Sequence, residues 1–254
     1  MMHLIDSHCH LDFDEFNRDR DDILLHCQKL GVKDIVIPGV TANSWQQLLT
    51  ICQSSTMLHP ALGLHPMCMH QHRLEHLHQL ADYIADNHII AIGEIGLDFY
   101  IPDHNKEDQI ELFTEQLKMA QTAELPVLLH VRKAHDHTIH LLKQYPVLGG
   151  IVHAFNGSLQ QAEHYQQLGF ALGVGGAITH HRATRLRSLF STLPLSSIVL
   201  ETDAPDMPLS EMQGQRNSPE NIPKILTCLA DIRDESYQEL ALATTHNSRQ
   251  VLKL

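Results

Sequence analysis

The stretch Leu4-Ile5-Asp6-Ser7-His8-Cys9-His10 decides the fold class, because a short apolar strand runs directly into metal-binding side chains. Side chains alternate between the two sides of an extended strand, so His8 and His10 lie on one side. Neutral imidazole commonly binds divalent metals, and this spacing predicts part of a metal site, the alternative being two ordinary polar residues. A doubly wound open sheet would carry a glycine-rich phosphate turn here, and residues 6–10 contain no glycine.

Apolar runs of strand length alternate with amphipathic runs of helix length along the rest of the chain. The strands are continuously apolar, which is typical of strands buried on both faces in a parallel barrel. Eight such units predict an α/β fold with one domain, residues 1–254, a (β/α)8 TIM barrel whose active site lies at the C-terminal ends of the strands. The predicted strands are 4–5, 34–37, 60–63, 89–94, 127–130, 150–153, 170–173 and 197–201, and the predicted helices are 18–30, 44–52, 74–84, 105–125, 135–145, 159–168, 182–190, 222–232 and 237–252.

The composition excludes several classes of protein. The net charge of −12 argues against a long basic groove for nucleic acid and against adhesion to an anionic membrane. The five cysteines are scattered without a CxxC pair, as is typical of reduced thiols. No apolar run approaches the length of a membrane span, and no secretory leader is recognisable. We therefore expect a cytoplasmic protein with no membrane contact and no obligate protein partner.

Side chains suited to metal binding or acid–base chemistry follow most of the predicted strands. In a barrel the carboxyl ends of the strands meet at one face, and active sites lie there. Each of these residues alone could be an ordinary buried polar group, but the whole set is typical of a site. The set comprises His8 and His10 after the first strand, His65 after the third, Glu94 after the fourth, His130 after the fifth, His153 after the sixth, and Glu201 with Asp203 after the eighth.

Seven motifs resemble, in order, spacing and flanking residues, those of the TatD-type deoxyribonucleases of the amidohydrolase superfamily. They are Asp-Ser-His-Cys-His-Leu-Asp (6–12), Gly-Leu-His-Pro (63–66), Ile-Gly-Glu-Ile-Gly-Leu-Asp (92–98), Leu-His-Val-Arg (129–132), His-Ala-Phe-Asn-Gly (153–157), Glu-Thr-Asp-Ala-Pro (201–205) and Arg-Asn-Ser-Pro (216–219). The resemblance implies a metal-dependent hydrolase with one metal held by His8, His10 and Asp203. It implies a second metal held by His130 and His153, with Glu94 bridging the two.

This ligand set suits a two-metal phosphodiesterase, in which cations about 4 Å apart stabilise the attacking and leaving oxygens. Mixed nitrogen and oxygen ligands favour Zn²⁺, Mn²⁺ or Fe²⁺ and leave Mg²⁺ possible. Asp203 is the candidate to accept a proton from the attacking water. Glu201 and His65 are candidates to support the ligands or to move a proton to the leaving group.

The expected substrate is DNA or a short nucleic-acid end, hydrolysed at its phosphodiester bonds in the manner of an exonuclease. Two alternatives remain. An amidohydrolase or esterase could use the same metals on a small carbonyl substrate, and a metal-binding module without catalysis is the other, which the complete ligand set disfavours. The candidates to bind phosphate are Arg132, Arg216 and Asn217, and the candidates to stack a base are Tyr100 and Phe155.

Overall fold

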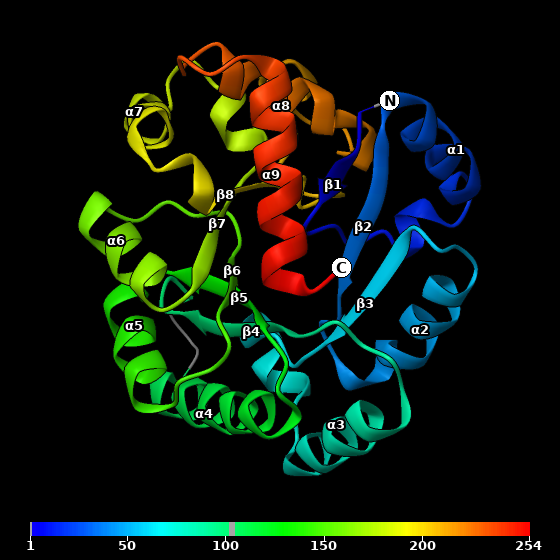
Figure 1. Cartoon of the computed structure of the whole chain (residues 1–254). Helices are drawn as coiled ribbons and strands as arrows, with labels where there is room; N and C mark the ends of the chain where they lie inside the picture. Colours follow the sequence, from blue (N-terminus) through cyan, green and yellow to red (C-terminus); the bar gives the residue numbers. More distant parts are fainter. Residues whose placement is uncertain (1, 102–104) are drawn as a thin grey trace.

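The computed structural model describes residues 2–101 and 105–254, and its eight strands form one parallel sheet in the order β1 to β8 (Figure 1). Each strand pairs in parallel with the next along the chain. The ring is completed where the Ser7 N–H donates to the carbonyl of Leu200 at 2.9 Å, joining the ends of the first and last strands. This arrangement confirms the predicted (β/α)8 TIM barrel.

The helices alternate with the strands and surround them (Figure 1). None of the helices in the described part of the chain combines the length and apolar character needed to cross a bilayer. The strands are β1 (Leu4–Asp6), β2 (Val32–Pro38), β3 (Leu58–Leu62), β4 (Ala91–Asp98), β5 (Val127–Arg132), β6 (Gly150–Val152), β7 (Phe170–Val174) and β8 (Ile198–Leu200). The α-helices are α1 (Arg20–Leu30), α2 (Trp45–Gln53), α3 (Leu74–Asp86), α4 (Lys106–Ala123), α5 (His135–Gln144), α6 (Leu159–Gln167), α7 (Thr184–Thr192), α8 (Ile222–Ala230) and α9 (Tyr237–Leu252).

The predicted elements are all present, and β4 differs most from its prediction. We expected this strand to end at Glu94, but it continues to Asp98 and pairs with β5 over its last four residues. Gly96 permits this because a Cβ at that position would lie 2.0 Å from the carbonyl oxygen of His130. Glu94 is therefore a residue within a strand, with its side chain in the barrel, rather than a residue of a strand-end loop.

Helix α9 crosses one end of the barrel (Figure 1). Its last turn places Leu252, which is 1% exposed, in a cluster with Val36, Ala61 and Leu128 from the inner side of the strands. Burying these apolar side chains closes the amino-terminal end of the barrel. Access to the interior is thus left to the opposite end, where the strands carry their polar residues.

Helix α4 holds two strand ends through buried glutamines two turns apart. Gln109 accepts the N–H of Asp98 at 2.8 Å and donates to its carbonyl at 3.0 Å. Gln116 makes the same pair of bonds with Leu64, at 2.7 and 3.1 Å. Both glutamines are fully buried, so these bonds satisfy backbone groups that water cannot reach. The clamps fix the backbone beside His65 and at the end of β4.

Replacing Gln116 with Met is expected to lower the free energy of unfolding by about 2–6 kcal/mol, because two buried backbone groups of Leu64 lose their partner at roughly 1–3 kcal/mol each. Urea denaturation followed by circular dichroism measures this. The control is Gln121→Met on the same helix, which removes one exposed bond to the carbonyl of Pro146 and should cost less than about 0.5 kcal/mol. Equal losses in the two variants would show that the clamp on Leu64 is not what Gln116 contributes.

Candidate metal centre

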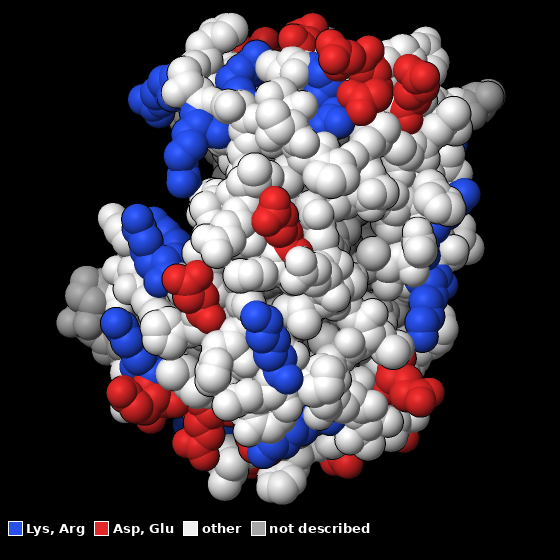
Figure 2. Space-filling model, turned by 60° about the vertical axis from the view of Figure 1, so that its left-hand side comes forward, with Lys and Arg blue, Asp and Glu red and all other residues white. Residues whose placement is uncertain are grey.

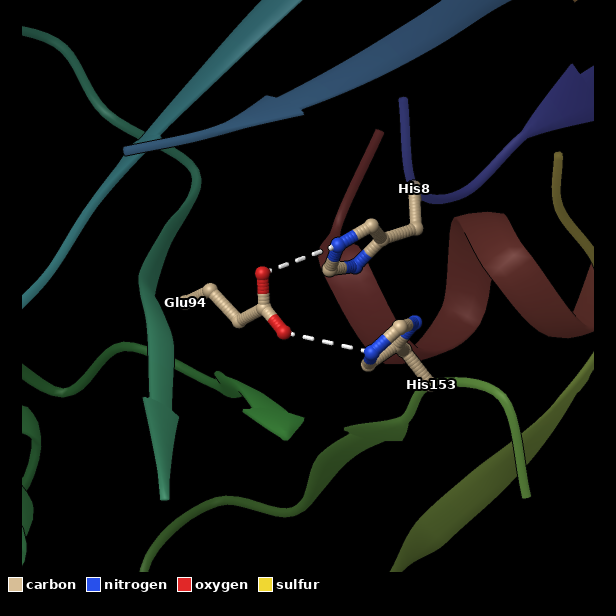
Figure 3. A group of neighbouring side chains, drawn as sticks. All are labelled: His8, Glu94 and His153. Atoms are coloured by element: carbon tan, nitrogen blue, oxygen red, sulfur yellow. Dashed lines mark hydrogen bonds and ion pairs between the residues drawn. The ribbon is translucent and has the colours of Figure 1, made fainter. Parts of the chain in front are cut away.

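Glu94 lies at the centre of a cluster of imidazoles at the carboxyl ends of the strands. Its side chain is almost completely buried, and Figure 3 shows its two oxygens directed at His8 and His153. Those two rings also stack on each other, with centroids 4.0 Å apart. Oε1 lies 3.0 Å from His65 Nε2, 3.1 Å from His130 Nδ1 and 3.2 Å from His153 Nε2, while Oε2 lies 3.2 Å from His8 Nε2 and 3.4 Å from His10 Nε2.

Asp203 forms the second acidic part of the cluster. It adopts a left-handed conformation, with φ at 57°, and its N–H donates to the carbonyl of His8 at 2.9 Å. This turn directs Oδ1 to within 3.6 Å of His8 Nε2 and 3.7 Å of His10 Nε2. Burial raises the pKa of Asp203 to about 6, although His153 and His10 oppose the shift.

Asp6 positions this corner of the site, and the sequence analysis gave it no role. Its fully buried carboxylate accepts the N–H of Thr202 at 2.9 Å, the Thr202 hydroxyl at 2.5 Å and the N–H of His8 at 3.2 Å. Burial raises the pKa of Asp6 to about 8. One side chain thus ties β1 to β8 and fixes the backbone on which His8 and Asp203 are carried.

The protonation of the cluster follows the balance between burial and charge. Burial lowers the pKa of His8 to about 3 and that of His65 to about 4, so both rings are neutral at pH 7. Burial also opposes a charge on His10 and His153, but Glu94 outweighs it, raising the pKa of His10 to about 9 and that of His153 well above its usual range. Burial disfavours ionised Glu94 as well, yet the imidazoles hold its pKa well below the usual value. Glu94 therefore attracts positive charge, here protons on His10 and His153, which a bound metal would have to displace.

The donor atoms and their free lone pairs fit divalent metals. The Nδ1 atoms of His8, His10 and His153 are buried and have no hydrogen-bond partner in the described part of the chain. A metal that displaced the protons facing Glu94 would leave each ring with its proton on Nδ1 and its Nε2 lone pair directed at the metal. Three groups of residues could each hold a metal ion, because their ligand atoms lie within 4.8 Å of one another. They are His8 with Glu94 and His153, His8 with His10 and Asp203, and His65 with Glu94 and His130.

His65 lies closer to the centre than the expected ligand set implied. Its Nδ1 accepts the N–H of Met67 at 3.0 Å, so the proton of the neutral ring resides on Nε2, which points at Glu94. A ring in this state donates to the carboxylate and has no lone pair left for a metal. The hydrogen bonds therefore favour a supporting role for His65, although its distance from Glu94 matches that of the other imidazoles.

Asp98 is a site residue that the sequence analysis missed. The buried carboxylate lies 3.1 Å from His130 Nε2, while His130 Nδ1 faces Glu94. A carboxylate at Nε2 fixes the proton there and leaves the Nδ1 lone pair directed into the cluster, as outer partners of metal-binding imidazoles commonly do. The position of Asp98 at the end of an apolar strand, two residues after Gly96, was a signal that could have identified it.

Glu201 supports the loop that carries His153. Its Oε1 accepts the N–H of Ala154 at 2.5 Å and lies 3.7 Å from His153 Nδ1. The carboxylate packs so closely on β7 that a Cβ at Gly173 would lie 2.0 Å from Oε2. Glu201 is 1% exposed, so the structure gives it contact with His153 rather than with the open side of the site.

A cavity of about 610 Å³ opens above the cluster. Its lining includes Glu94 and Asp203 on one side and Arg132 on the rim. The Arg132 guanidinium lies 3.8 Å from the centre of the exposed Tyr100 ring, which holds it at the mouth. Phe155 also borders the cavity but is 1% exposed and packs against His135 and Tyr165, so only Tyr100 presents an exposed ring for stacking.

Two predicted substrate residues are placed elsewhere. Arg216 pairs with Asp19, at 3.0 Å from Nη1 and 2.5 Å from Nη2, and its guanidinium covers the Phe16 ring at 4.4 Å. Asn217 is fully buried and donates to the carbonyls of Thr202 at 2.8 Å and Met207 at 3.2 Å. Neither belongs to the described lining of the cavity. Asp19 and the loop after β8 already use the polar groups of both residues, and their contact with substrate stays a prediction.

The chain matches one family along nearly its whole length. The model of the family described as "TatD related DNase" matches residues 5–253. The chain is 42% identical over 247 residues to the uncharacterized metal-dependent hydrolase YjjV of Escherichia coli (strain K12), covering 96% of this chain and 95% of that protein. It is 32% identical over 248 residues to the 3'-5' ssDNA/RNA exonuclease TatD of Erwinia amylovora, covering 94% of this chain and 96% of that protein.

The fold comparison agrees with the sequence comparison. The crystal structure of YjjV, a TatD homologue from Escherichia coli K12, superimposes with a TM-score of 0.96 at 40% identity, covering 99% of this chain and 98% of that one. The chain therefore belongs to the family of TatD-related DNases.

Proposed function

We propose that this metal-dependent hydrolase cleaves phosphodiester bonds at the ends of DNA strands, as an exonuclease with two divalent metals. The observation that carries the proposal is the buried carboxylate of Glu94 among five imidazoles, beside Asp203 and below a cavity with an arginine on its rim. The naming of the Erwinia amylovora relative as an exonuclease of single-stranded DNA and RNA supports the choice of substrate. The fold alone would not identify the substrate, because the same barrel serves many reactions.

We assign the metal ligands and the proton acceptor to particular residues of the cluster. His8, His10 and Asp203 would hold one metal, and His130 and His153 a second, with Glu94 between them. Bound Zn²⁺, Mn²⁺ or Mg²⁺ would lower the pKa of water and neutralise charge on the phosphoryl oxygens. Asp203, at the edge of the cavity, accepts the proton of the attacking water.

The remaining groups orient these parts and the substrate. Arg132, stacked on Tyr100 at the mouth, binds a phosphate oxygen of the strand. His65 borders the cavity and donates a proton toward Glu94, and we assign it the support of that carboxylate and contact with the leaving oxygen. Glu201 and Asp98 keep His153 and His130 in position.

The proposal is tested by metal analysis followed by digestion of end-labelled oligonucleotides. The purified chain is analysed by plasma mass spectrometry and then assayed with Zn²⁺, Mn²⁺ or Mg²⁺ on single and double strands. Stepwise loss of nucleotides from one end, abolished by a chelator, is expected. Hydrolysis of small esters, lactones or amides without any cleavage of oligonucleotides would instead identify a carbonyl hydrolase and refute the proposal.

The salt dependence of binding should reveal a short contact with the strand. With a net charge of −12, the chain has local donors rather than a basic track. Each phosphate neutralised on a single strand contributes about −0.7 to the logarithmic salt slope, so two or three phosphates predict a slope of roughly −1.5 to −2. Arg132→Ala should flatten this slope by about 0.7. Fluorescence anisotropy with an uncleavable oligonucleotide measures the slope at fixed metal.

The matched control for Arg132→Ala is Arg216→Ala. Arg216 is paired with Asp19 and does not belong to the described cavity lining, so its loss should leave the slope unchanged. A slope several times steeper than predicted, and insensitive to Arg132→Ala, would reveal an extended basic track and remove the argument for cleavage at strand ends.

A further inference from the structure

Part of the cavity lining is apolar and belongs to a segment with no part in the metal chemistry. This segment comprises the short helix η4 (Gly176–Thr179) and helix α7. Ala177, Leu186 and Phe190 border the cavity from it. Phosphate and divalent cations gain nothing from such a wall, so it serves another part of the substrate.

The size of the cavity points to the same conclusion. At about 610 Å³ it falls within the range of roughly 300–1,000 Å³ that small-molecule sites occupy. A phosphate group held at Glu94 and Asp203 would leave most of this volume to the group attached to it. In a strand of nucleic acid, that group is a sugar and its base, whose flat face can pack against a wall of apolar side chains.

The only Lys, Arg, Asp or Glu side chains in and around this segment are arginines. Residues 164–200 contain three arginines and no Asp or Glu, in a chain whose net charge is −12. Arg185 is exposed and donates through Nη2 to the carbonyl of Asn156 at 2.6 Å, and Asn156 itself lines the cavity. Figure 2 shows a hollow at the left-hand edge of the molecule with Lys and Arg side chains on both sides of it. The apolar wall thus ends in a fixed cation at the mouth.

We propose that the η4–α7 wall is the subsite for the nucleoside next to the cleaved phosphodiester, with Ala177 and Leu186 against the base and Arg185 on the neighbouring phosphate. The proposal rests on the proposed function and adds to it the location of the base. It also gives the strand a direction through the site, from the metal cluster past α7. Because the wall offers no described hydrogen-bond donor aimed at a base edge, it accepts the four bases alike.

The test compares a normal oligonucleotide with one whose terminal nucleotide lacks a base. In both, the bridging oxygen of the terminal linkage is replaced by a methylene group, so that binding is measured without cleavage. Anisotropy on the metal-loaded full chain should show about tenfold weaker binding of the abasic end, the loss expected when one base contact is removed. In Leu186→Asn the affinities for the normal and the abasic oligonucleotide should differ by less than about twofold, because the wall no longer distinguishes the two ends.

Arg185→Gln provides a second variant at an exposed position that does not disturb the wall. It should weaken both oligonucleotides equally and reduce the salt slope by about 0.7. Arg73→Gln, which removes the same charge from the exposed start of α3, is the control and should change neither quantity. Equal binding of normal and abasic ends by the unmodified chain would overturn the subsite alone. Failure to bind either oligonucleotide would overturn the subsite and the proposed function together.

Discussion

Replacing Asp203 with Asn is expected to lower turnover by about 10²- to 10⁴-fold, the usual contribution of a positioned general base. Asparagine keeps an oxygen of similar position and size but cannot accept the proton of the attacking water. The Asp203 carboxylate is suited to this role because burial raises its pKa to about 6, which makes it a stronger base than an ordinary aspartate while leaving it ionised at pH 7. Turnover is measured at saturating metal, and metal content by plasma mass spectrometry.

The control for this change is Asp206→Asn. Asp206 lines the same cavity three residues further along the chain and is exposed, so its loss removes an equal charge without removing the candidate base. We expect its turnover to stay within a few-fold of the unmodified protein. Near-normal turnover in Asp203→Asn at full metal loading would exclude Asp203 as the proton acceptor and transfer that role to another group of the cluster.

The barrel could be predicted from the sequence because its determinants are local. Continuous apolar runs mark strands buried on both faces, and features such as Gly31, with φ at 88° after α1, end the helices where expected. The end of β4 could not be predicted in this way. A carboxylate normally interrupts a buried strand, and Glu94 is tolerated inside the barrel because imidazoles from four other strands or their following loops surround it.

The candidate site also has features that could be predicted from the sequence and features that could not. The clustering of the histidines and acids that follow the strands could be predicted because the fold brings all strand ends together. The contacts of Arg216 and Asn217 could not be predicted. Arg216 pairs with Asp19, which lies 197 positions away in the chain, and the buried Asn217 amide donates to the carbonyl of Thr202. Asp98 and Asp6 also escaped notice, because a supporting carboxylate has no sequence pattern of its own. Only the fold shows which imidazole or backbone group it contacts.

Replacing Glu94 with Gln is expected to abolish binding of the metal pair and, with it, activity. The change keeps the side chain's shape but removes the charge that five imidazoles surround, leaving the site without its central anion. In the unmodified protein, metal at 100 times its Kd should stabilise the fold by about 2.7 kcal/mol. For a chain of this size that corresponds to a rise in Tm of roughly 5–11 °C. The variant should show no such rise when metal is added to the chelator-treated protein.

Glu201→Gln is the matched control, because Glu201 is a second glutamate at 1% exposure in the same cluster. Glutamine can still accept the N–H of Ala154 through its carbonyl oxygen, so the loop that carries His153 should remain in place. This variant should therefore keep most of the metal-dependent rise in Tm, with circular dichroism confirming that both variants are folded. If Glu94→Gln instead shows the full rise, the imidazoles and Asp203 hold the metals without a shared carboxylate, and the two-metal arrangement around Glu94 is wrong.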